Sequence, residues 1–113
     1  MKKYILLLCV IVCFLNCQNQ NSVDPFNYER DTPSWLKTKI DSMATNNFYV
    51  GSKVFRHTWH YNLVYYIRVG LSSCTYCEVY YENGSKITFT NDSMLQDYLN
   101  NRKNEILIWE WKD

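Results

Sequence analysis

An apolar run opens the chain and ends abruptly at a cysteine. Residues 4–15 (YILLLCVIVCFL) are apolar or aromatic throughout and follow the basic pair Lys2-Lys3. A helix that crosses a bilayer needs roughly 20 apolar residues. This shorter run is instead typical of the hydrophobic region of a secretory signal peptide. The pattern therefore predicts a signal peptide over residues 1–16.

The first apolar periodicity after this run predicts an amphipathic helix. Leu36, Ile40 and Met43 recur at positions i, i+4 and i+7, so they share one helix face. Thr32 suits the N-cap and Pro33 suits the first helical position. A helix this short needs another element to pack against.

Alternating apolar and polar residues after Gly51 predict a first β-hairpin. Residues 54–59 and 63–69 alternate with period 2 and are rich in β-branched and aromatic side chains. Such side chains suit a half-buried sheet. Residues 60–62 are expected to form the tight connection between the two strands.

The dipeptide Asn83-Gly84 lies between two further alternating runs, residues 78–81 and 86–89. Both turn residues tolerate the positive φ angles of a type I′ turn, so the pattern predicts a second hairpin.

A second helix and a last strand complete the pattern. Residues 91–93 predict the helix cap. The apolar stripe of this helix consists of Met94, Leu95, Tyr98 and Leu99. Residues 106–111 are apolar on both faces at their start, which is typical of an inner strand. The order predicts an α+β fold: a small antiparallel sheet of about five strands, two hairpins plus a C-terminal strand, with two helices packed on one face.

All of these elements fall in residues 32–113, which we expect to form a single domain. Residues 17–31 show no apolar period and include Pro25, which is typical of a tether. Removal of Lys2 and Lys3 with the signal peptide would change the formal net charge from +1 to −1. Because nucleic-acid binding requires clustered Lys and Arg, we expect no nucleic-acid partner.

The stretch Leu15-Asn16-Cys17 resembles the lipobox of bacterial lipoproteins, in which a cysteine directly follows the apolar run. The resemblance implies that Cys17 receives a diacylglycerol group and becomes the N-terminus of the mature chain. The amide-rich residues 18–22 would then connect the domain to the membrane.

Cys74 and Cys77 are the thiols that remain once Cys17 is lipidated. A C-x-x-C pair fits a structural disulfide, half of a metal site or a redox-active couple. A thioredoxin-like couple requires a helix N-terminus, whereas the residues after Cys77 alternate like a strand. A small domain outside the cytoplasm favours the disulfide, and the other two roles stay open.

His57, His60, Cys74 and Cys77 together have the composition of a tetrahedral zinc site. The predicted hairpin argues against this site, because a seven-residue strand at ~3.3 Å per residue would separate the His60 turn from Cys74 by roughly 20 Å. We expect no cofactor, and we expect His57 to be a hydrogen-bonded sheet residue. A thiol- or metal-dependent envelope protein that uses these four residues is the alternative.

No catalytic constellation is recognisable in the sequence. The serines lack the strained turn that exposes a catalytic nucleophile. Gly51, Gly70 and Gly84 are scattered, so no glycine-rich loop could hold a phosphate. We therefore expect a protein that is not an enzyme.

Aromatic residues make up 17% of the chain, more than one covered sheet face could bury. Exposed aromatic residues can anchor a protein or glycan ligand. We select Tyr66, Arg68, Tyr80 and Trp111 as the candidate outward patch. Cross-strand aromatic pairs that only stabilise the sheet are the alternative interpretation.

The lipobox occurs together with PSWL at residues 33–36, VYY at 64–66 and VYYENG at 79–84. With these features the chain is similar, over roughly residues 1–90, to small secreted lipoproteins of Bacteroidota. That group has no assigned activity, so the resemblance implies a lipid-anchored cell-envelope protein without implying a reaction. The uncharged residues after Cys17 imply an anchor in the outer membrane that faces the periplasm. We expect a non-enzymatic binding or interaction module.

Overall fold

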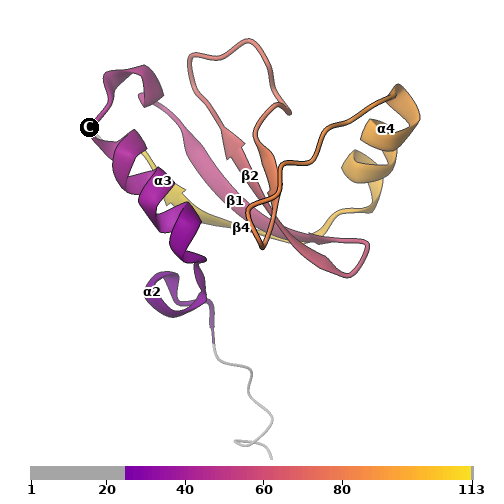
Figure 1. Ribbon diagram of the computed structural model, residues 1–113, viewed down its shortest axis with the longest axis horizontal. Helices are drawn as coiled ribbons and strands as arrows, with labels where there is room; N and C mark the ends of the chain where they lie inside the picture. The colour runs from indigo at the N-terminus through magenta and orange to yellow at the C-terminus, as the bar shows by residue number, and fades with distance from the viewer. Residues whose placement is uncertain (1–24, 113) are drawn as a thin grey trace, which may run out of the picture.

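The computed structural model describes residues 25–112 and shows a central sheet with helices on either side (Figure 1). The antiparallel strands lie in the order β3-β2-β1-β4. They are β1 (Lys53–Trp59), β2 (Asn62–Arg68), β3 (Val79–Tyr81) and β4 (Lys103–Glu110). The helices are α2 (Tyr28–Asp31), α3 (Ser34–Ala44), the 3-10 helix η1 (Asn47–Tyr49) and α4 (Asp92–Asn101). The expected signal peptide, Cys17 and the first part of the expected tether lie outside the described residues.

Within residues 25–112, no helix has the length and apolar character that crossing a bilayer requires.

The predicted α+β class is confirmed, but the sheet has four strands rather than about five. The missing strand is residues 86–89, of which only Lys86 forms a bridge, to Tyr80. The backbone N–H of Ile87 donates to the Val79 carbonyl over 2.7 Å. The Ile87 side chain is then buried in the core. The chain therefore leaves the sheet after one bridge to fill the space under α4.

Both hairpin turns differ from their predictions: Asn83-Gly84 does not form the expected type I′ turn, and the first connection has two residues rather than the expected 60–62, because Asn62 already belongs to β2. Gly84 has a positive φ of 92°, and its N–H donates to the Tyr81 carbonyl, but Asn83 is not among the residues with positive φ. This is the pattern of a three-residue loop that ends in a glycine bulge. His60 and Tyr61, by contrast, have φ angles of 50° and 64°, as a type I′ turn requires.

The helices cover opposite faces of the sheet, so the predicted one-sided arrangement is wrong. The α3 core consists of Leu36, Ile40, Met43, Val54, Tyr65 and Ile67. The α4 core consists of Trp59, Val64, Tyr66, Val79, Ile87 and Tyr98. Both alternating sets of β2 side chains are apolar, and each set must be removed from water. A helix on each face achieves this.

Strand β4 lies at the sheet edge, so the prediction of an inner strand is wrong. It pairs with β1 alone, and its register shifts twice along that pairing. Ile106 and Leu107 are 37% and 47% exposed. Bulges of this kind make an exposed edge a poorer template for pairing with another chain.

The helix starts are close to their predicted positions. Helix α3 begins one residue later than predicted, with Pro33 rather than Thr32 at the N-cap. Asn91 caps α4 by accepting a hydrogen bond from the Met94 N–H, as expected. Helix α2 was not predicted, and it falls within residues 17–31, which the sequence interpretation assigns to the tether. The side chain of Asn27 caps α2.

Candidate functional site

A cavity of about 450 Å³ opens on the α4 side of the sheet, beside the loop between β2 and β3. We call it the arginine cavity. Its lining residues are Phe55, Tyr66, Arg68, Val69, Gly70, Ser72, Cys74, Thr75, Tyr76, Arg102 and Glu105. It is the cavity that brings together the most of the residues selected from the sequence: Tyr66, Arg68 and Cys74.

Three aromatic rings form one side of the arginine cavity. Phe55 and Tyr66 are direct cross-strand partners, and their rings stack 6.0 Å apart with an interplanar angle of 19°. The ring of Tyr76 lies 5.4 Å from that of Tyr66. The Tyr66 hydroxyl donates to the Thr75 carbonyl over 2.8 Å. Burial raises the pKa of Tyr66, so the hydroxyl keeps its proton at neutral pH.

Two guanidinium groups and one carboxylate also line the cavity. Arg102 lies 5.3 Å from the ring of Tyr98, and its Nε atom is 3.9 Å from a carboxylate oxygen of Glu105. Arg68 is exposed, and none of the ion pairs within residues 25–112 includes it. Its cross-strand partner on β1 is Lys53, which carries the same charge. Positive charge therefore exceeds negative charge at this end of the sheet.

The disulfide between Cys74 and Cys77 holds the outer wall of the cavity. The two Cα atoms are 5.6 Å apart. The Ser72 hydroxyl oxygen accepts a hydrogen bond from the Cys74 N–H over 3.2 Å, which tightens the same loop. Thr75 and Tyr76 lie between the paired cysteines, so the disulfide fixes the two residues that contact Tyr66.

A second cavity, of about 510 Å³, lies on the other side of this loop. We call it the apolar cavity. Its lining residues are Cys74, Thr75, Tyr76, Cys77, Lys86, Ile87, Thr88, Phe89 and Leu95. Cys74, Thr75 and Tyr76 line both cavities, so the two adjoin.

The four residues selected as an outward patch do not come together. Tyr66 is only 5% exposed and lies in the α4 core. Tyr80 is on the opposite face, where its ring lies 5.4 Å from that of Trp35 and its hydroxyl accepts a hydrogen bond from Lys39. Trp111 does not line the arginine cavity. The patch prediction is wrong because helices cover both sheet faces: Tyr66 is buried on the α4 side and Tyr80 lies on the α3 side, so only Tyr66 and Arg68 share a site.

The expected hydrogen-bonded state of His57 is also wrong. His57 is 1% exposed, and neither ring nitrogen has a hydrogen-bond partner among the described side chains and backbone. Its ring packs 5.2 Å from that of Tyr98. Burial and the nearby charge of Arg102 lower the pKa of His57 to about 4. The imidazole is therefore neutral at physiological pH.

The histidines and cysteines do not converge on a metal site. His60 pairs with Asp97 on α4 across 2.5 Å, and the cysteines pair with each other. In the part of the chain from residue 25 to 112, no three His, Cys, Asp or Glu side chains are placed to hold one ion. A metal site built from His57, His60, Cys74 and Cys77 thus has no geometric support.

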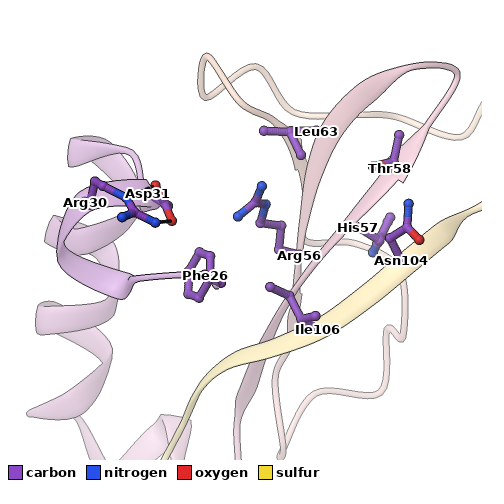
Figure 2. Close-up of a pocket in the computed structure, with 9 residues that line it drawn as sticks. All are labelled: Phe26, Arg30, Asp31, Arg56, His57, Thr58, Leu63, Asn104 and Ile106. Carbon is purple, nitrogen blue, oxygen red and sulfur yellow. Dashed lines mark hydrogen bonds and ion pairs between the residues drawn. The ribbon is translucent and has the colours of Figure 1, made fainter. Parts of the chain in front are cut away.

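A further cavity of about 490 Å³ lies on the α3 side, between α2 and the sheet. Figure 2 shows Arg56 extending from the sheet toward α2. Its guanidinium lies 5.1 Å from the ring of Phe26. Arg30 forms two hydrogen bonds with Asp31, at 2.8 and 2.9 Å, and this contact holds the pKa of Asp31 at about 2. These contacts dock α2 onto the sheet. The lining carries two arginines and one aspartate, the same formal charge as the lining of the arginine cavity, but here Arg30 is held by Asp31 and Arg56 lies against the ring of Phe26.

Sequence reasoning missed Phe55, Tyr76, Arg102 and Glu105 as site residues. The expected connection of three residues, 60–62, sets a different register from the observed two-residue turn at His60 and Tyr61, and only the observed turn places Phe55 opposite Tyr66. Arg102 and Glu105 depend on which sheet face α4 covers, and no local pattern reveals that.

Comparison with protein-family models, with curated proteins and with solved structures finds no match for this chain. Function is therefore inferred from the geometry and charge of the site itself.

Proposed function

We propose that this protein is a lipid-anchored module of the cell envelope that binds an anionic ligand in the arginine cavity and does not transform it. The observation that carries the proposal is the shared opening of Arg68 and Arg102 onto one cavity beside three aromatic rings. Guanidinium groups bind carboxylate and phosphate groups with two parallel hydrogen bonds, and aromatic faces accept flat or apolar groups.

The placement of charge supports an anionic ligand. Like charges directly opposite each other on neighbouring strands destabilise a sheet, and Arg68 faces Lys53 in this way. Glu110 lies opposite Lys53 on the other side, so it relieves Lys53 rather than Arg68. A bound anion would offset the charge that Arg68 leaves unbalanced.

The orientation of the domain supports an anchored binding role. Figure 1 shows α2, where the described chain begins, at one end of the molecule and the loop between β2 and β3 at the other. A diacylglycerol on Cys17 would hold the α2 end toward the membrane. The arginine cavity would then face away from the membrane surface, in the periplasm if the anchor is in the outer membrane.

The anchor and the ligand site are tested separately. The intact mass of protein from a membrane fraction should include a diacylglycerol adduct, and Cys17→Ser should abolish it. An unmodified mass for the unaltered chain would refute the anchor.

For the ligand site, the full chain in phosphatidylcholine nanodiscs is titrated with inorganic phosphate and acetate at constant ionic strength. Saturable thermal stabilisation is expected, and it should disappear in the double variant Arg68→Gln/Arg102→Gln. Lys103→Gln is the matched control, because Lys103 follows Arg102 directly but pairs with Thr58 and does not line the cavity. Equal stabilisation in the double variant would refute the site.

A further inference from the structure

The arginine cavity and the apolar cavity form a site with two different ends. They adjoin along Cys74, Thr75 and Tyr76, which line both. We call these three shared residues the Tyr76 ridge. The guanidinium groups of Arg68 and Arg102 lie on one side of it. The other side presents apolar side chains, of which Ile87, Phe89 and Leu95 are the largest.

We propose that the two cavities together bind one anionic amphiphile, with its carboxylate or phosphate head at Arg68 and Arg102 and a single acyl chain in the apolar cavity. This inference rests on the proposed anion site and names its ligand class. The head would be held by charge-assisted hydrogen bonds. The acyl chain of the ligand would cross the Tyr76 ridge. It would then pack against Phe89 and Leu95, where it is removed from water.

The apolar cavity favours an acyl chain over a sugar. Sugar hydroxyl groups need several hydrogen-bond partners, because a polar group that is buried without a partner is costly. Ile87, Phe89 and Leu95 offer none, and the hydrogen-bonding side chains of the lining are limited to Thr75, Tyr76, Lys86 and Thr88. An acyl chain needs only apolar contact, and cavities of this size, about 510 Å³, are large enough for small ligands.

The ridge is built to keep its position. The ring of Tyr76 contacts both Tyr66, at 5.4 Å, and Tyr98, at 6.2 Å. The disulfide closes the loop on either side of it. A fixed ridge sets the distance between the charged end and the apolar end, so it selects ligands by the position of the charge relative to the chain.

The test is photo-crosslinking of the full chain in phosphatidylcholine nanodiscs with three probes that carry a diazirine in the middle of a sixteen-carbon chain. One probe is the free fatty acid, one is the lysophosphatidate and one is the neutral primary amide. We expect the anionic probes to label the two segments that line the apolar cavity, residues 74–77 and 86–95, as mapped by peptide mass spectrometry. We expect the amide to label them at least tenfold less. The stronger of the two anionic probes identifies the head group.

Variants separate the two ends of the site. Arg68→Gln/Arg102→Gln should lower labelling by the anionic probes to the level of the amide, and Lys103→Gln should leave it unchanged. Leu95→Gln should lower labelling while the stabilisation by inorganic phosphate persists, because only the apolar end is altered.

Equal labelling by all three probes, or labelling outside residues 74–77 and 86–95, would overturn the inference. If phosphate and acetate still stabilise the protein in that case, the anion site survives and only the acyl chain is refuted. If they do not, both proposals fail.

Discussion

The hydroxyl of Tyr66 on β2 donates a hydrogen bond of 2.8 Å to the carbonyl of Thr75, nine residues later in the chain. This bond connects the aromatic side of the arginine cavity to its disulfide-closed wall. Because Tyr66 is only 5% exposed, water cannot replace the bond without a local opening of the loop.

Tyr66→Phe should lower the free energy of unfolding by about 1 kcal/mol, the usual contribution of one such hydrogen bond. Chemical denaturation of the full chain in nanodiscs measures it. Tyr61→Phe is the matched control, since Tyr61 is fully exposed at the hairpin tip and should change nothing. An unchanged stability for Tyr66→Phe would mean that the loop position does not depend on this bond.

Loss of the disulfide should weaken ligand binding at the wall of the arginine cavity while the domain stays folded. A four-residue loop closed by a disulfide is worth ~2 kcal/mol in the chain-entropy treatment. Cys74→Ser/Cys77→Ser should therefore lower the free energy of unfolding by about that amount and weaken binding of phosphate. Alkylation with and without prior reduction monitors the bond, and thiols that react before reduction would contradict the disulfide.

Much of the fold could be predicted because its signals are local. The apolar stripe of α3, the cap at Asn91 and the alternation of β1 and β2 each specify one element from a few adjacent residues. The placement of elements relative to one another could not be predicted in this way. Residues 106–111 are apolar on both faces at their start, yet β4 is an edge strand, because pairing depends on which neighbours the chain brings to β1.

The candidate site was predicted only in part for the same reason. Tyr66 and Arg68 lie on one strand with a spacing of two, so sequence alone places them on one face. Tyr80 was selected with them, but the pairing of Tyr65 with Tyr80 turns that ring to the α3 side. Arg102 joins the site only because α4 covers the opposite face.

Gly70 is required by a close approach between two loops rather than by an unusual φ. A Cβ atom there would lie 2.4 Å from the Val50 carbonyl oxygen, which is backbone and cannot rotate away. Gly70→Ala should therefore lower the free energy of unfolding by about 1–3 kcal/mol. Leu71→Ala, at a neighbouring residue that is 65% exposed, should stay within about 0.5 kcal/mol of the unaltered protein. Comparable effects from both variants would refute the steric explanation.

His57 should make the domain sensitive to mild acid. Its pKa is lowered from 6.5 to about 4 in the folded protein, by burial first and by the charge of Arg102 second. Between these two pH values the unfolded chain binds more protons than the folded one, so stability falls as the pH falls from about 6.5 toward 4. The loss attributable to His57 is at most about 3 kcal/mol.

His57→Leu removes the titrating group while keeping a side chain of similar size. It should be at least as stable as the unaltered protein at pH 7, because neither ring nitrogen has a partner to lose. Denaturation curves from pH 4 to pH 7 would give the difference between the two proteins, which isolates His57 from His60 and the carboxylates. The difference should shift in favour of the leucine variant as the pH falls. Parallel curves would show that His57 is protonated in the folded state as readily as in the unfolded one, and would refute its burial as a neutral group.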